Sequence, residues 1–151
     1  MKISAMRSQI KKLIDATNVI DHAYRVKGRS MAVKPNIVVL LYALANEDNL
    51  SQSSLHNNWL LPLSTINTIV SECRASGYIT LEPIPGRRRE CYLRFTPKGR
   101  AFAELILAEI HAAEEQAMRE TIARFSPDFI EALAFYAETF HQALNLEENR
   151  Q

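Results

Sequence analysis

The sequence predicts a mainly α-helical chain that contains one small β-hairpin. Two observations lead to this fold class. Apolar residues recur at three- and four-residue spacing over most of the 151 residues, as they do on one face of an amphipathic helix. Between residues 78 and 95 the pattern changes to alternation, on both sides of a Pro85-Gly86 turn signal. We therefore expect four helices before the hairpin and two after it.

Two helices are expected before residue 50. Residues 3–26 carry one apolar stripe at helical spacing, and Gly28 is expected to end that helix. The segment 27–35 then forms a basic linker that closes with Pro35. A second helix follows with Asn36 as its N-cap, and it is apolar nearly all round, which predicts burial.

A helix-turn-helix pair is expected next. Ser51 is a suitable N-cap for a short helix, which Leu55 and Trp59 anchor in the core. A longer helix begins at Pro62, because proline is preferred in the first helical turn, and Gly77 occupies the position of a C-terminal glycine. The apolar stripe of this longer helix consists of Leu63, Ile66, Ile69, Val70 and Cys73.

Two further helices follow the hairpin. Thr96-Pro97 opens a long helix to about residue 124, and Ser126-Pro127 opens the last one. Both helices display large apolar side chains, which a small domain cannot cover alone. These side chains are Phe102, Leu105, Ile106, Phe129, Leu133, Tyr136 and Phe140. We expect burial against a second copy of the chain, and the alternative is an intramolecular helix pair. The polar tail from Glu147 is expected to fray.

The net charge of +1 conceals an uneven distribution. Residues 1–100 contain 15 Lys and Arg against 7 Asp and Glu, whereas residues 101–151 contain 3 against 10. A basic front half suits a polyanionic partner, and an acidic rear half should face away from it.

Several function classes lack support in the sequence. No secretory or membrane segment is visible, and Cys73 and Cys91 have no metal-ligand spacing, so we expect a cytoplasmic protein without a cofactor, metal or membrane partner. His111, Glu114 and Glu115 have helical spacing that suits a metal, but a solvated helix face is favoured. Because no phosphate-binding loop or nucleophile elbow occurs, we do not expect an enzyme.

Three helices followed by a hairpin is the order of elements in a winged helix-turn-helix. There the second helix of the motif lies in the major groove of DNA, and the hairpin loop reaches the backbone or the minor groove. Short hydrogen-bonding side chains contact base edges, and asparagine is suited to adenine. The candidate contacts on the helix from Pro62 are Ser64, Thr65, Asn67, Thr68 and Ser71, with Arg74 for a phosphate. The alternative is an ordinary solvated helix face.

The hairpin tip carries three consecutive arginines, Arg87, Arg88 and Arg89. Adjacent like charges repel one another, and an anion bound beside them would offset this repulsion. Such a cluster therefore predicts an anion-binding surface. Each phosphate that an arginine neutralises adds to the release of counterions and makes binding more dependent on salt. The alternative is a solvated hairpin tip.

Four segments together resemble the MarR family of bacterial transcriptional regulators. They are Ser64 to Val70, Ser76 to Ile79, Arg88-Arg89 and Leu93 to Arg100, and the match covers about residues 36–100. The resemblance implies a winged helix-turn-helix region over 36–100, flanked by an N-terminal dimerisation helix and linker (1–35) and C-terminal dimerisation helices (101–151).

Two departures accompany the resemblance. Arg89 falls on the family's wing arginine, but Arg87 stands where the family has an aspartate that helps to order the wing. The resemblance therefore does not by itself imply an ordered wing. The segment Leu60-Leu61-Pro62-Leu63 is unusually apolar ahead of the recognition helix, and we interpret it as serving packing.

The resemblance also implies a function. It predicts a homodimer that binds a pseudo-palindromic operator in double-stranded DNA and regulates transcription, as a repressor released by a small aromatic or phenolic effector. Tyr24, Arg25 and Tyr42, with Lys27, are candidate effector contacts. Redox sensing in this family usually uses a cysteine near the N-terminus, where this chain has none. The alternative function is a winged-helix adaptor that binds a protein and not DNA.

Overall fold

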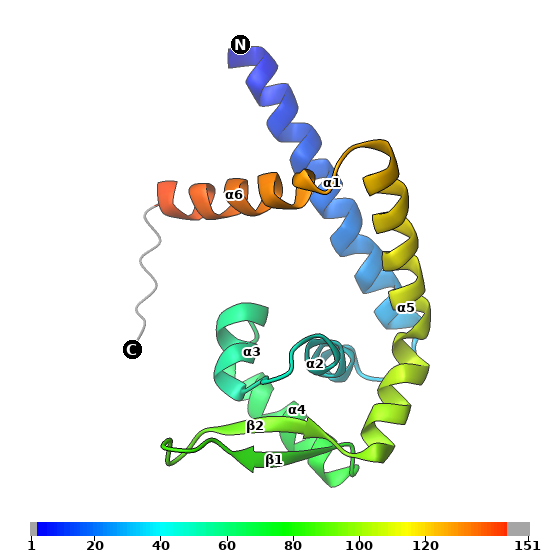
Figure 1. Ribbon diagram of the computed structural model, residues 1–151, viewed down its shortest axis with the longest axis vertical. Coiled ribbons are helices and arrows are strands. Elements are labelled where there is room, and N and C mark those ends of the chain that lie inside the picture. Colours follow the sequence, from blue (N-terminus) through cyan, green and yellow to red (C-terminus); the bar gives the residue numbers. More distant parts are fainter. Residues whose placement is uncertain (1–2, 145–151) are drawn as a thin grey trace. The chain divides into compact units, whose positions relative to one another are not determined.

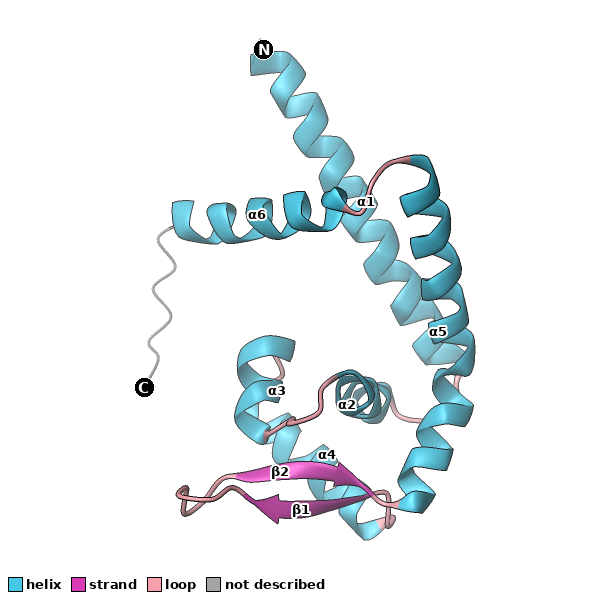
Figure 2. Ribbon diagram, in the orientation of Figure 1, coloured by secondary structure: helices cyan, strands magenta, loops and turns pink. Residues whose placement is uncertain are grey.

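The computed structural model describes residues 3–144, and within them it contains six helices and one antiparallel hairpin (Figure 1). In chain order the elements are α1 (Ile3–Ser30), α2 (Pro35–Asn46), α3 (Gln52–Trp59), α4 (Leu63–Ala75), β1 (Ile79–Pro83), β2 (Cys91–Phe95), α5 (Pro97–Arg124) and α6 (Asp128–Ala143). The predicted fold class is confirmed (Figure 2). The tail from Glu147 lies outside the described residues. No helix within 3–144 has both the length and the apolar character that a membrane span requires.

The chain divides into two compact units, Met1–Ile110 and His111–Gln151. The first unit holds the helix-turn-helix, the hairpin and the first part of α5. The second holds the rest of α5 and α6, and none of the residues of α6 is buried.

The first helix is longer than predicted. α1 continues through Gly28 to Ser30, so the prediction that Gly28 ends it is wrong. A glycine inside a helix costs only about 1 kcal/mol, which local contacts can offset. Here Lys27 forms an ion pair with Glu109 of α5, and the Ser30 hydroxyl donates to the Lys27 carbonyl over 2.7 Å. These contacts hold the last turn of α1 in place.

The prolines mark helix starts, but not always at the predicted position. Pro35 is itself the first residue of α2 and Lys34 is its N-cap, so the prediction of Asn36 as N-cap is wrong. Proline suits the first position because its φ is fixed and its missing N–H has no partner there in any helix. Pro62 and Pro127 instead immediately precede α4 and α6, one residue from the predicted position.

Ser51 caps α3 as predicted and also joins it to the hairpin. Its hydroxyl accepts from the Ser54 backbone N–H over 3.1 Å, and the Ser54 hydroxyl accepts from the Ser51 N–H over 3.4 Å, which is a capping box. Ser51 also forms an isolated β-bridge with Tyr92. The helix-turn-helix and β2 are therefore connected through backbone pairing.

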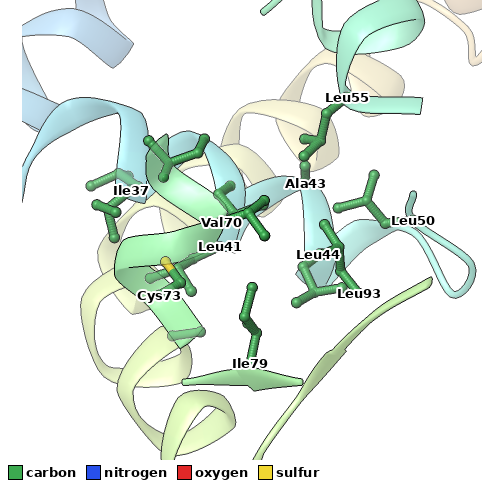
Figure 3. Packing of buried hydrophobic residues seen from close by; sticks show 14 of the residues in the cluster. Ile37, Leu41, Ala43, Leu44, Leu50, Leu55, Val70, Cys73, Ile79 and Leu93 are labelled. Carbon is green, nitrogen blue, oxygen red and sulfur yellow. The ribbon is translucent and has the colours of Figure 1, made fainter. Parts of the chain in front are cut away.

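One apolar core fills the first unit (Figure 3). It lies between α2, α3, α4, the hairpin and residues 99–110 of α5. Its largest fully buried side chains are Leu40, Leu41, Leu50, Leu55, Ile66, Leu93, Leu107 and Cys73. Two predicted core residues differ: Leu63 is exposed, so the prediction is wrong for it, and Trp59 packs against the core but is only half-buried.

The hairpin places its inward residues on this core. β1 pairs with β2 in a register that sets Leu81 opposite Leu93 and Pro83 opposite Cys91. The turn that follows β1 uses Pro85 and Gly86, whose φ is 78°, and the Arg87 N–H donates to the Ile84 carbonyl over 3.1 Å. A left-handed residue after proline is typical of a type II turn, as the Pro-Gly pair predicts.

A close backbone contact fixes where α5 begins. The Tyr78 carbonyl accepts from the Thr96 N–H over 3.0 Å, and the Thr96 hydroxyl in turn caps α5 by accepting from the Gly99 N–H over 3.0 Å. A Cβ atom at Gly99 would lie 1.8 Å from the Tyr78 carbonyl oxygen. Only glycine fits this position, because the obstructing atom belongs to a hydrogen-bonded backbone.

Gly99→Ala should therefore destabilise the folded chain by about 3 kcal/mol, the upper end of the usual cost of forcing atoms into a packed interior. Urea unfolding followed by circular dichroism at fixed protein concentration measures the effect. Gly28→Ala is the matched control: it has no atom within 4 Å of the added Cβ and lies in a helix, so it should stabilise the chain by about 0.5–1 kcal/mol. Equal stability of the two variants would contradict the close contact at Gly99.

Candidate nucleic-acid interface

The second helix of the helix-turn-helix presents a polar face to solvent. α4 buries Ile66, Ile69, Val70 and Cys73 on one side. The predicted contact residues Ser64, Asn67, Thr68, Ser71 and Arg74 are all exposed on the remaining surface. Thr65 is half-buried at the edge of this face. The structure thus brings the predicted α4 residues together on one helix surface.

A groove runs between the start of α2 and α4. Its volume is about 620 Å³, and Lys34, Asn36, Ser64, Thr65, Thr68 and Glu72 are among its lining residues. The Lys34 ammonium lies 2.8 Å from a Glu72 carboxylate oxygen across the groove. Sequence reasoning missed Lys34 as a neighbour of α4. The one clue was its place at the end of a basic segment directly before a helix.

The apolar segment ahead of α4 is not a packing segment. Leu60 and Leu63 are 76% and 58% exposed, so the interpretation that this segment serves packing is wrong for both. Leu61 alone is half-buried against the core. Leu60 also adopts a φ of 54°, which is unusual for a bulky residue and makes the turn into α4. α4 therefore begins directly after this turn, with Leu63 as its first residue, and Leu63 faces solvent.

The wing tip contains an exposed ion pair. The Arg87 guanidinium lies 2.7 Å from a Glu90 carboxylate oxygen, and this hydrogen bond raises the pKa of Arg87 further. At the position where the resemblance places an aspartate, this chain has an arginine that pairs with Glu90, three residues further along. Arg88 and Arg89 are exposed and form no ion pair within the described residues. These two arginines are therefore available to an anion.

Another arginine of the hairpin has an internal role. Arg94 donates to the Asp48 carbonyl, to the Asn49 side chain over 3.1 Å and to Glu82. It thereby ties the loop between α2 and α3 to both strands. Sequence reasoning gave Arg94 no role, because two of its partners lie more than 40 residues away along the chain.

A second cavity lies beside α1 and α2. It has a volume of about 700 Å³, and its aromatic wall consists of Tyr24, Tyr42 and Trp59. The Tyr42 ring meets Tyr24 edge-on at 6.2 Å and Trp59 edge-on at 5.6 Å between centroids. The indole N–H of Trp59 donates to Glu47 over 2.7 Å. Trp59 is thus the member of this wall that sequence reasoning missed.

The charged residues around this cavity are Asp21, Arg25 and Arg29. Arg25 is paired with Asp21, whereas Arg29 forms no ion pair within the described part of the chain. Of the predicted effector contacts, the structure brings Tyr24, Arg25 and Tyr42 to the cavity. Lys27 does not line it and is engaged by Glu109 instead.

The two cysteines lie in different elements, Cys73 in α4 and Cys91 in β2. Burial raises the pKa of the Cys73 thiol to about 11, with a smaller contribution from Glu72, so the thiol stays protonated near neutral pH. Cys91 is half-buried in β2. Over residues 3–144 no group of three or more His, Cys, Asp or Glu lies close enough to hold a metal.

Comparison with known proteins gives a match at the level of structure only. Neither the protein-family models nor the curated proteins match this sequence. Among solved structures, a MarR family regulator from Neisseria meningitidis is similar with a TM-score of 0.68 at 20% identity, covering 93% of this chain and 99% of that one. AbsC, a MarR family transcriptional regulator from Streptomyces coelicolor, is similar with a TM-score of 0.64 at 14% identity, covering 96% and 97%.

A third structure carries small molecules. It is the Staphylococcus aureus MarR protein in complex with salicylate and kanamycin, similar with a TM-score of 0.62 at 14% identity and covering 97% of this chain and 96% of that one. At such identities the likeness concerns the fold. The polar helix α4, the hairpin with its arginine tip and the flanking helices of this chain thus form the winged-helix fold of the MarR family of transcriptional regulators.

Proposed function

We propose that this chain is a DNA-binding transcription regulator that binds a pseudo-palindromic operator as a homodimer. One observation supports it above the others. The exposed polar face of α4 and the exposed Arg88 and Arg89 belong to the same winged-helix unit, whose core and hairpin pairing fix their spacing. α4 supplies groups that contact base edges, and the arginines supply charge for phosphates.

The dimer is supported by apolar surface in each unit. α6 exposes Ile130, Leu133, Phe135, Tyr136 and Phe140, and its C-cap Leu144 is exposed as well. α1 separately exposes Met6, Ile14, Val19, Ile20 and Val26. Exposed apolar surface on this scale is expected to be covered by a partner, and a second copy is the partner that produces a two-fold symmetric reader of DNA.

Selection of bound duplexes from a random pool tests the function directly. We expect a two-fold symmetric motif whose half-sites are about one helical turn apart, because each protomer places one α4 in a major groove. Recovery of no duplex, together with a defined protein partner, would instead support the adaptor function.

Arg89 should contribute to affinity through phosphate neutralisation. Arg89→Ala is expected to weaken duplex binding and to lower the slope of log affinity against log salt by about 0.9 for each phosphate that is no longer neutralised. Fluorescence anisotropy across a salt titration measures both quantities. Arg7→Ala, an exposed arginine of α1 outside the winged helix, is the matched control and should bind like the wild type. If Arg89→Ala matches the wild type at every salt concentration, the wing does not contact phosphate.

We further propose that the aromatic cavity binds a small aromatic or phenolic acid that relieves repression. The three rings supply stacking surface, and Arg29, which has no ion pair within residues 3–144, supplies a cation for the carboxylate. Arg25 is engaged by Asp21 and so offers less to a ligand. The salicylate in the Staphylococcus aureus structure is an aromatic acid of this kind.

Ligand binding can be followed with Trp59, because the chain contains a single tryptophan and it lines the cavity. Salicylate should change the fluorescence of the wild type with saturation, and Arg29→Ala should weaken its binding by about tenfold or more. Gly28→Leu places a side chain into the open space beside Gly28 in the cavity. This variant should lose the fluorescence change on adding salicylate but should still bind the duplex. An unchanged salicylate titration in Gly28→Leu would show that the ligand binds elsewhere.

A further inference from the structure

The exposed Leu63 is unusual for its place in the fold. It is the first residue of α4, and 58% of its surface is accessible although an apolar side chain gains nothing from contact with water there. A single exposed leucine on a protein surface needs no explanation by itself. Here, however, it stands at the N-terminal end of the helix proposed to enter the major groove, where residues of a recognition helix contact base edges.

The helix geometry associates Leu63 with particular neighbours. Asn67 follows Leu63 by one helical turn, and Arg74 follows Asn67 by two, so the three side chains lie along one flank of α4. All three are exposed. The opposite flank carries Thr65 and Glu72, which line the groove towards Lys34. Leu63 therefore belongs to the flank that holds Asn67, the residue best suited to adenine.

Local structure holds Leu63 in this exposed position. Leu60 makes the turn with a φ of 54°, and the half-buried Leu61 packs against the core. The Pro62 carbonyl then accepts from the Ile66 N–H over 3.0 Å, which starts the first turn of α4. The leucine is thus presented by a defined backbone and not by a loose loop.

We propose that Leu63 determines part of the operator sequence by contacting the 5-methyl group of a thymine in the major groove. The inference rests on the proposed DNA-binding function. The thymine methyl is the one apolar group that base pairs expose in that groove, and apolar side chains recognise it. Side chains one helical turn apart are about 5–6 Å apart, so the thymine lies within about two base pairs of the adenine contacted by Asn67.

Deoxyuridine provides the test, because it differs from thymidine only in lacking the 5-methyl group. Each thymine of one half-site of the selected operator is replaced in turn, and affinity is measured by anisotropy. At one position the wild type should bind about three- to fivefold more weakly without the methyl group, the effect of leaving one methyl-sized contact unmade. Leu63→Ala should bind the thymidine and deoxyuridine duplexes with the same affinity. Leu63→Met should still bind the thymidine duplex more tightly than the deoxyuridine duplex.

Two controls separate this contact from general effects. Leu60→Ala removes a still more exposed leucine outside α4 and should retain the wild-type sensitivity to the methyl group. Asn67→Ala should lose discrimination at an adenine within about two base pairs of the sensitive thymine. The inference is overturned if Leu63→Ala keeps the full methyl effect, or if no thymine of the half-site shows one in the wild type. Salt-dependent, sequence-selective binding by the wild type would in either case still support the proposed function.

Discussion

Leu93 is the point at which the hairpin, the helix-turn-helix and the core meet. Its side chain is fully buried, it stands opposite Leu81 in the register, and its N–H donates to the Leu50 carbonyl over 2.8 Å. Leu50 immediately precedes the capping box of α3. A one-residue slip of β2 would turn Leu93 to solvent and break this bond. The pairing of β1 with β2 is therefore fixed in one register. The distance between the α4 surface and the wing tip depends on that register.

The arginines of the hairpin divide by their partners, and the division decides how much positive charge each of them offers to an anion. Arg94 is engaged within the fold, holding the loop after α2, and Arg87 is held by Glu90 at the tip. A carboxylate offsets the charge of each of these two, Glu82 for Arg94 and Glu90 for Arg87, whereas Arg88 and Arg89 have no such partner among the described residues. The number of basic residues therefore overstates the charge available to phosphate. The same reasoning applies to Lys34, which Glu72 holds beside α4.

Local patterns predicted most of the fold, and the errors concern residues whose environment is set by distant segments. Ser51 fixes a helix end through its own chemistry, and the alternation on both sides of Pro85-Gly86 reflects a hairpin with one buried face. Helical spacing placed Leu63 on the buried stripe, but at the first turn the core no longer covers that side of α4. Trp59 was expected to anchor its helix in the core, and it does pack against the core, but its remaining surface lines a cavity. The close approach of Gly99 to the Tyr78 carbonyl is likewise invisible in local sequence. The periodicity of a sequence predicts which face of a helix is apolar. It does not predict how far along the helix the core covers that face.

Pro35 connects the two hollows of the first unit. It lines the aromatic cavity beside Tyr42 and also the groove beside α4, where the adjacent Lys34 reaches Glu72. Under the proposed function, a ligand in the cavity contacts the same first turn of α2 that flanks the recognition helix. Such a ligand can release DNA only if it binds the DNA-free arrangement of this turn more tightly than the DNA-bound one. The start of α2 is therefore where a difference between the two arrangements has to arise, because it is the segment that both surfaces share.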